Sequence, residues 1–518
     1  MTPVTGRAQP PVARLLMSAR PPAPPPAARP PVAPGLTPAE SRPAGPGLLE
    51  PMLPALGPWL AGRRWFDARY AGAALTARAA SVVGEEPPLL LHGVVTAHRP
   101  GGPPLHHQLL LGLHPHLPAR LEPAAITCVP DGPWRGWRLY DALADGTLLG
   151  LLLRTLADGG SGPGPRLERA GRFPLPVGGV PRPLEAEQSN TTVAYGDRVL
   201  LKLFRRPEPG PHTEVDALGA LTRQRCTHTP RLYGALHSDA PGAEGLVLGL
   251  VEEFLPDARD GWEEAVRQAR ACLDGSCRGV PATGGFTGYA HSLGRAVAEV
   301  HGSLAEFFGR TRLTAEDVAE EVARMTARLK EAAEEVPALG RYTGRLGTLF
   351  DDYARLAGRG CPVFAQRTHG DLHLGQALHT ADGWRIVDFE GEPARPAAER
   401  ARLQPVLKDV AGMLRSLDYA ARTALALAGP ESGDLEGTSP AQRLRRLRRA
   451  HAWSVRNRRA FVSGYASAGR DDPDCHPVLL RAFEADKAVY ETLYESRHRP
   501  HLLPVPLAAV HRLAGTAR

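Results

Sequence analysis

Hydrophobic and polar positions alternate in several short stretches of the first half of the chain. Strand-like segments are found at residues 74–83, 88–99 and 106–117, and residues 193–206 alternate around a Gly-Asp turn. A period of two predicts β-strands, and a Gly-Asp turn between two such runs predicts a hairpin. A further apolar strand at residues 246–256 runs into a proline.

Apolar positions at helical spacing dominate the second half. Long amphipathic stretches cover residues 289–309, 314–338, 441–468 and 478–496. Shorter helices are expected at residues 48–62, 138–159 and 213–225, each ending near a glycine or a polar turn. Residues 364–393 interrupt the helices and are expected to form a loop, a strand, a turn, a second strand and a loop.

These patterns divide a chain of 518 residues, which is too long for one ordinary core. Residues 1–46 contain 14 prolines and one acidic residue, and we expect them to form a disordered tail. Residues 47–175 are expected to form an N-terminal accessory domain of strands and helices. Residues 176–257 are expected to form a strand-rich lobe, and residues 258–518 a mainly helical one.

Composition narrows the classes of function. With 43% hydrophobic and 23% charged residues and no long uncharged apolar run, the chain is expected to be globular, cytoplasmic and without a membrane helix. Its 6 cysteines form no CxxC pair, so neither a disulfide scaffold nor a structural zinc site is expected. The net charge of +7 comes from scattered arginines, and we expect no nucleic-acid partner.

Lysine is rare, because only four occur among 62 basic residues. Where arginine replaces lysine almost everywhere, a remaining lysine is one that chemistry or geometry requires. Lys202 is the first of the four and stands in an apolar strand, Val199–Phe204. A strand lysine can simply mark an exposed edge. In kinases, however, such a lysine binds phosphate oxygens and pairs with a helix glutamate, for which Glu214 is the candidate here.

The segment His369-Gly370-Asp371 and the carboxylate Asp388 carry the strongest chemical signal. Asp371 lies in a loop where it can reach a substrate hydroxyl, and Gln376 follows five residues later. Asp388 ends an apolar strand. An amide oxygen and a carboxylate that converge from two loops suit Mg²⁺, as in the D-x-x-x-x-N and D-F-G motifs of kinases. The alternative for each aspartate alone is a polar loop or a helix cap.

Two further segments suit a nucleotide. The polar loop with Ser189, Asn190 and Thr191 can offer hydroxyl and backbone N–H groups to phosphates, although no G-x-G-x-x-G motif precedes the strand of Lys202. Glu252 and Phe254 lie where an apolar strand passes into a linker, which is where adenine would bind to backbone groups. A plain linker is equally compatible with that pattern.

Together these segments resemble the actinobacterial maltokinases. The resemblance rests on EQSNTTVAYGDRVLLKLFRRPEPGPHTEVDAL, EEFLPDARDGW, LGRAVAEVH, THGDLHLGQALHTADGWRIVDFEGEPARPAAER, KDVAGMLRSLDYAA and KAVYETLYESRHRP, which span residues 185–505, and on Arg64-Trp65-Phe66 nearer the start. It implies an α+β, bilobal, protein-kinase-like fold. In that fold residues 47–175 would be a cap domain on the N-lobe (176–257), followed by a helical C-lobe (258–518).

The resemblance also implies an activity. Maltokinases use ATP and Mg²⁺ to phosphorylate maltose at its anomeric hydroxyl, giving maltose 1-phosphate for α-glucan synthesis. Asp371 would be the catalytic base and Gln376 and Asp388 the metal ligands, while Lys202 and Glu214 would hold the nucleotide. We expect His369 to brace the catalytic loop and His373 to be structural. No membrane partner is expected, and a monomer or weak homodimer is the expected state.

Four residues are candidates for contact with the acceptor. Lys487, Tyr490 and Tyr494 share one face of the helix expected at residues 478–496, and a tyrosine ring can pack on a sugar face. Both rings could instead lie in a helical core, but the resemblance favours a sugar contact. Glu390 is expected to approach either the metal or a sugar hydroxyl.

Two alternatives remain open. One is another small-molecule kinase, of the aminoglycoside or choline phosphotransferase type, which shares the His-Gly-Asp motif. The other is an inactive relative that binds a nucleotide or a glucan, against which stands the presence of every expected catalytic residue.

Overall fold

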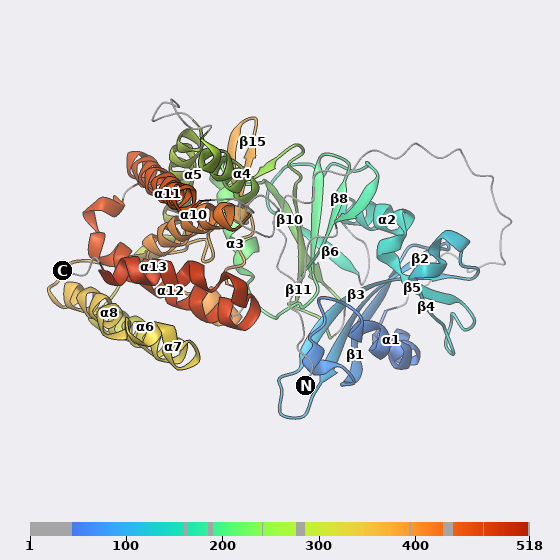
Figure 1. Cartoon of the computed structure of the whole chain (residues 1–518). Helices are drawn as coiled ribbons and strands as arrows, with labels where there is room; N and C mark the ends of the chain where they lie inside the picture. Colours follow the sequence, from blue (N-terminus) through green and yellow to red (C-terminus); the bar gives the residue numbers. More distant parts are fainter. Residues whose placement is uncertain are drawn as a thin grey trace. The chain divides into compact units, whose positions relative to one another are not determined.

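The structure is a computed structural model, and it describes residues 44–159, 164–184, 190–240, 242–275, 285–392, 395–427, 439–469 and 471–515. Nearly all of the tail predicted at residues 1–46 lies outside these ranges. The described residues form two compact units (Figure 1). One contains residues 44–215 and 231–256, and the other contains residues 216–230 and 257–515.

The first unit contains two antiparallel sheets. The five-stranded sheet has the order β1-β2-β3-β5-β4, and the six-stranded sheet has the order β6-β10-β11-β9-β8-β7. The strands are β1 (Ala74–Val83), β2 (Leu89–His98), β3 (Leu105–His114), β4 (Ala125–Cys128), β5 (Arg138–Asp141), β6 (Pro165–Arg169), β7 (Pro181–Leu184), β8 (Asn190–Tyr195), β9 (Val199–Phe204), β10 (Leu232–Ser238) and β11 (Val247–Glu253). The helices are α1 (Leu53–Ala61), α2 (Gly146–Ala157) and the start of α3 (Thr213–Arg223).

Most of the longer elements agree with the hydrophobic pattern, but the short strands β4 and β6 were not expected from it and two assignments were wrong. Residues 138–141 were expected to begin a helix but form β5, because they pair with both β3 and β4 in the five-stranded sheet. The helix α2 starts only after Asp145, whose carboxylate accepts the backbone N–H of Thr147 at 3.0 Å. The second difference is β6, which the domain prediction put in the cap but which pairs with β10 of the six-stranded sheet.

Apolar side chains cover both faces of the five-stranded sheet. On one face they pack with α1 and with the Arg64-Trp65-Phe66 segment. On the other they form a single core with α2 and with residues of the six-stranded sheet, including Val193, Leu201 and Leu203. The cap and the N-lobe strands therefore share a hydrophobic core, and removing residues 44–157 would expose part of it to water.

The second unit is mainly helical (Figure 1). Its helices are the remainder of α3, α4 (Gly261–Asp274), α5 (Phe286–Phe308), α6 (Ala315–Glu335), α7 (Pro337–Gly340), α8 (Thr343–Gly358), α9 (Ala397–Arg400), α10 (Leu407–Leu427), α11 (Pro440–Ala468), α12 (Pro477–His498) and α13 (Pro504–Gly515). Its strands are β12 (Arg259–Asp260), β13 (Arg310–Arg312), β14 (Phe364–Gln366), β15 (Ala377–Thr380) and β16 (Gly383–Ile386).

Helices α5 and α11 approach each other closely at two glycines. A Cβ on Gly294 would overlap the carbonyl oxygen of Phe461, and a Cβ on Gly464 would overlap that of His291. The helices thus pack backbone against backbone at a distance that a larger residue at either position would prevent.

No helix within the described ranges has the length and apolarity needed to cross a bilayer. The five cysteines in the same ranges are all free thiols.

Candidate functional site

The loop that carries Asp371 begins directly after β14 and is held by α10. Asp409 of α10 accepts the backbone N–H groups of His369 at 2.7 Å and of Gly370 at 3.0 Å. Its carboxylate also lies 3.0 Å from Nε2 of His301, whose other ring nitrogen lies 2.9 Å from the Tyr465 hydroxyl. Burial opposes ionisation of Asp409, but the bonds and charge of the two histidines outweigh it and lower the pKa.

His369 joins this loop to the loop after β16. Its Nε2 lies 3.0 Å from the carbonyl oxygen of Val387, and its Nδ1 accepts the backbone N–H of Asp371 at 3.3 Å. These contacts brace the loop as the sequence predicted. His373 is half-buried, and its Nδ1 accepts the backbone N–H of Gly375 at 3.0 Å. Desolvation lowers the pKa of His373, so it is a neutral, structural residue, also as predicted.

Asp371 shares a cation with Glu392. The ammonium group of Lys487, on α12, lies 3.1 Å from the Asp371 carboxylate and 2.8 Å from that of Glu392. It also lies 4.8 Å from the centre of the Tyr490 ring. Burial opposes the charge of Lys487, but Glu392 and Asp371 raise its pKa well above the ordinary value. Lys487 therefore stays charged beside the carboxylate that was predicted to be the base.

Gln376 and Asp388 meet as the sequence predicted. The amide Nε2 of Gln376 donates to Asp388 at 2.8 Å, which orients both side chains. The other amide atom, Oε1, is buried and has no hydrogen-bond partner among the described residues. Leaving such an oxygen unpaired costs free energy, and an oxygen ligand next to a carboxylate fits a hard divalent cation. Gln376 and Asp388 therefore suit Mg²⁺.

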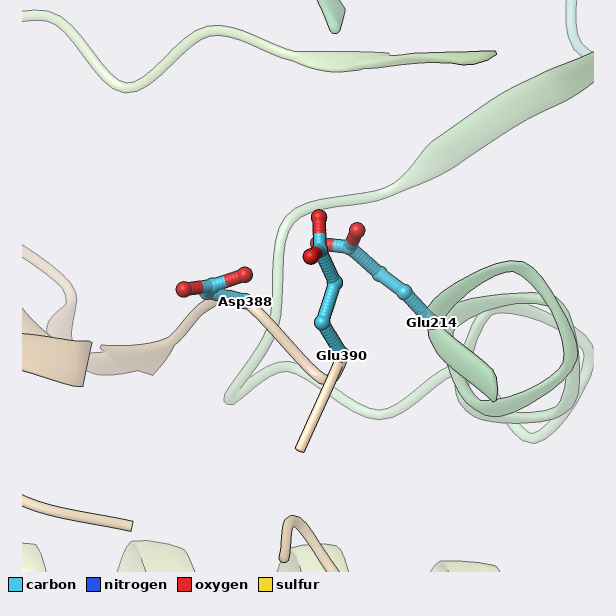
Figure 2. A group of neighbouring side chains, drawn as sticks. All are labelled: Glu214, Asp388 and Glu390. Atoms are coloured by element: carbon cyan, nitrogen blue, oxygen red, sulfur yellow. The ribbon is translucent and has the colours of Figure 1, made fainter. Parts of the chain in front are cut away.

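The backbone of Asp388 supports the same interpretation. Its φ angle is +67°, in the left-handed region that a residue with a side chain seldom occupies. Strain of this kind persists only where the surrounding structure enforces it, and it is common at functional sites. Asp388 and Glu390 project from the same loop (Figure 2). Glu390 is half-buried, and its predicted contact with metal or sugar stays a prediction.

In the other unit, Lys202 pairs with Glu214 as predicted. The Lys202 ammonium lies 3.1 and 3.0 Å from the two carboxylate oxygens of Glu214. Glu214 lies in the first turn of α3 (Figure 2). Both side chains are buried, with 7% and 1% of their surface exposed. A lysine held in this way is a fixed point charge rather than a solvated edge residue.

The strand register separates the predicted nucleotide residues into two groups. Thr192 and Leu250 are the direct partners of Lys202, so Asn190 and Glu252, two residues away on the same strands, share its face of the sheet. Phe254 packs with Leu184, Ala194 and Leu200 in a small apolar cluster, and Ala194 and Leu200 belong to that face. This apolar patch beside a buried lysine could accept a purine ring.

Thr191 lies on the opposite face. Its hydroxyl oxygen accepts a hydrogen bond from Nε of Arg205 at 2.7 Å. The prediction that the Thr191 hydroxyl faces the phosphates is therefore wrong, because alternation along β8 turns this side chain away from Lys202. Ser189, the remaining predicted nucleotide residue, lies outside the described residues.

The two tyrosines of α12 form a row rather than a buried core. Both are half-buried, and their ring centres are 6.3 Å apart with the planes inclined by 24°. Tyr490 and Lys487 line a pocket next to Asp371, together with Arg328, Glu392 and Asp486. Tyr494 lies further along the helix against His498, at 4.6 Å between ring centres. The sugar contacts of both tyrosines remain predictions.

Three residues of this arrangement were not singled out from the sequence. Glu392 is the second glutamate of the DFEGEP motif, and Asp409 and His301 lie on the mostly apolar buried faces of α10 and α5. A charged residue inside an apolar helix face is a signal for a hydrogen-bonded role. Their most important partners could not be seen in the sequence, because Lys487 lies 95 positions from Glu392 and Asp409 lies 108 positions from His301.

Known proteins share this arrangement of domains. Residues 59–145 match the maltokinase N-terminal cap domain, and residues 287–444 match the phosphotransferase enzyme family. The glucosamine kinase of Streptacidiphilus jiangxiensis is 33% identical over 341 residues, which cover 63% of this chain and 71% of that protein. The chain belongs to the same family. This family, the capped phosphotransferases, joins a maltokinase-type cap to a phosphotransferase domain.

Other members agree with this assignment. The glucosamine kinase of Mycolicibacterium smegmatis (strain ATCC 700084 / mc(2)155) is 29% identical over 345 residues, covering 64% of this chain and 79% of that protein. A solved glucosamine kinase in complex with glucosamine, ADP and inorganic phosphate superposes with a TM-score of 0.62 at 27% identity, over 85% of this chain and 94% of that one. This capped phosphotransferase is therefore a kinase that acts on a sugar or an amino sugar.

Proposed function

We propose that this capped phosphotransferase transfers the γ-phosphoryl group of ATP to the anomeric hydroxyl of maltose. The catalytic part of this proposal rests on the position of the Asp371 carboxylate. It lies 3.1 Å from the Lys487 ammonium and belongs to the loop that also supplies Gln376. Asp371 accepts the proton of the hydroxyl as its oxygen bonds to the γ-phosphorus. The bond from phosphorus to the β-phosphate oxygen breaks, and ADP leaves with that oxygen.

Gln376 and Asp388 would hold Mg²⁺ through Oε1 and the carboxylate. When bound, the ion would neutralise phosphate charge. The hydrogen bond from Nε2 of Gln376 to Asp388, at 2.8 Å, fixes the amide so that Oε1 remains available for the ion. Lys202, held by Glu214, would bind the phosphates as a point charge, and the apolar patch around Phe254 would bind adenine.

The charges around the acceptor pocket favour a neutral sugar. Asp371 and Glu392 already share Lys487, Glu392 also contacts Arg395, and Asp486 pairs with Arg328. An ammonium group on the acceptor would have to compete with these cations for a carboxylate. Sugar hydroxyls can instead donate to the carboxylates and accept from the cations at once. Maltose, whose hydroxyls carry no charge, meets that requirement.

Glucosamine is the second candidate. The relatives that match most of the chain are named glucosamine kinases, and a glucosamine kinase of similar fold has been solved with glucosamine bound. A glucosamine acceptor would place its ammonium beside one of the paired carboxylates and displace part of an ion pair.

The two acceptors are separated by incubating the purified chain with ATP, Mg²⁺ and either sugar and following ADP release. Phosphorylation of maltose at its anomeric hydroxyl removes the reducing end, so reducing sugar must disappear in step with ADP release. ADP release with glucosamine alone would exclude maltose. ADP release with neither sugar would contradict both candidates.

The role of Asp371 is tested separately by Asp371→Asn. This variant should bind ATP normally and lose about 10²-fold or more in turnover, since a positioned base contributes 10²–10⁴-fold. Near-normal turnover would remove Asp371 from the role of base.

A further inference from the structure

Arg205 occupies an unusual position, directly after β9. Its side chain is buried, with 2% of the residue exposed, and it forms no salt bridge with a carboxylate of the described residues, although Asp141 lies near enough to favour its charge. Burial lowers the pKa of Arg205 to about 10, so the guanidinium is still charged at neutral pH. A buried cation without a paired anion costs free energy. The contacts that it makes must offset that cost.

Those contacts come from two parts of the first unit. Nη1 of Arg205 donates to the backbone carbonyl of Gln108 in β3 at 3.1 Å, and the backbone N–H of Gln108 donates to the carbonyl of Arg205 at 3.1 Å. The guanidinium carbon lies 5.0 Å from the centre of the Trp65 ring, over its face. Arg206 donates to the carbonyl oxygen of Trp65 at 3.0 Å. The Arg64-Trp65-Phe66 motif and β3 therefore contact the two arginines that follow β9.

The side chain of Gln108 extends this connection to two strands. With its amide oriented to satisfy its neighbours, Gln108 donates to the carbonyls of Phe204 in β9 at 2.9 Å and of Leu248 in β11 at 2.7 Å. The same amide accepts from Nε2 of His92 at 3.2 Å. The cap therefore hydrogen-bonds to the strands that carry Lys202 and Glu252, at the end of the sheet where β9 finishes.

A third strand, β8, is connected to Arg205 through Thr191, whose hydroxyl oxygen accepts a hydrogen bond from Nε of Arg205 at 2.7 Å. Thr191 follows Asn190 directly at the start of β8 and pairs with Leu203 of β9. Its side chain points away from the face of Lys202, so its hydroxyl acts on Arg205 and not on a ligand at that face. The position of Asn190 relative to Lys202 thus depends on a guanidinium that the cap holds.

We propose that Arg205 is a positioning residue for nucleotide binding, through which Trp65 and Gln108 of the cap hold β8 and β9 in register for ATP. The cap then affects the binding of the nucleotide and not the binding of the acceptor. This inference rests on the proposed function of Lys202 in ATP binding.

The test compares Arg205→Met, Thr191→Val and the double variant, with Arg166→Met as a matched control. Arg166 lies in β6 of the same sheet and pairs with Asp239 at the surface. We expect Arg205→Met to raise the KM for ATP and the Kd for Mg-ADP about tenfold, with the acceptor KM within twofold. Thr191→Val should shift ATP binding in the same direction, and the double variant should bind ATP no more weakly than Arg205→Met. The control should bind both substrates normally.

Two comparisons separate positioning of the nucleotide strands from a general loss of stability. Trp65→Leu, which removes the ring over Arg205, should weaken ATP binding, whereas Trp134→Leu in the same cap core should lower only the melting temperature. Additive effects of Arg205→Met and Thr191→Val, or equal changes in the KM values for ATP and the acceptor, would overturn the inference.

Lys202→Met keeps this test separate from the proposed function. If that variant binds ATP normally the proposed role of Lys202 fails, whereas if it binds ATP weakly and Arg205→Met does not, only the present inference fails.

Discussion

Replacing Lys487 by methionine keeps the length of the side chain and removes the cation that Asp371 and Glu392 share. Two charged hydrogen bonds are lost, at 3.1 and 2.8 Å. Breaking a buried ion pair costs about 3–5 kcal/mol. Glu392 keeps Arg395 and Asp371 is 23% exposed, so we expect the free energy of unfolding to fall by only about 2–3 kcal/mol.

The effect on catalysis follows from the bond to Asp371. A hydrogen bond to a charged group contributes about 1.5–3 kcal/mol, and each 1.4 kcal/mol is a factor of ten. If the bond orients the base, Lys487→Met should lower kcat roughly 10- to 100-fold, with a smaller change in the KM for maltose. Steady-state kinetics with ADP detection and urea unfolding measure the two effects. Lys330→Met is the matched control, because Lys330 is exposed on α6.

The sequence alone predicts a different role, in which Lys487 binds the sugar. A Lys487→Met variant with normal kcat and a maltose KM raised tenfold would restore that assignment and refute the reasoning from Asp371. Unchanged kcat and KM together would show that the ion pair serves stability alone.

The remaining predictions concern the metal residues, the acceptor and the cap. Gln376→Leu should raise the Mg²⁺ concentration needed for half-maximal activity and weaken the thermal stabilisation by Mg-ADP; an unchanged Mg²⁺ requirement would exclude Oε1 as a ligand. Tyr494→Phe should raise the maltose KM roughly 2- to 12-fold, the cost of one hydrogen bond of about 0.5–1.5 kcal/mol, with the ATP KM unchanged; normal maltose binding would place the acceptor elsewhere. Burial lowers the pKa of His107 from its ordinary 6.5 to about 4, so below pH 6.5 the unfolded chain takes up a proton that the folded one does not. The free energy of unfolding therefore decreases as the pH falls from 6.5 towards 4. His107→Phe lacks this loss, so in urea unfolding its free energy of unfolding, relative to that of the parent, should rise by about 2 kcal/mol when the pH is lowered from 7.5 to 5. Parallel pH profiles would contradict this account of His107.

The sequence by itself determined the elements and the residue types of the site. Alternating and helical periods located β1, β2, the β8–β9 hairpin and the long helices α5, α6, α11 and α12, because burial of one face imposes these periods locally. The rarity of lysine singled out Lys202 and Lys487. The spacing of Asp371, Gln376 and Asp388 indicated a catalytic loop and a metal site, because those side chains come from two loops joined by a short hairpin.

Only the tertiary structure decided which distant residues meet. Residues 138–141 could continue a helix in isolation and form β5 because two strands pair with them. Lys487 reaches Asp371 across 116 positions, and Arg205 reaches Gln108 across 97. Such pairs depend on how α12 packs on the catalytic loop and how the cap packs on the N-lobe sheet. Packing of this kind is set by the sum of many apolar contacts, and no local pattern encodes it.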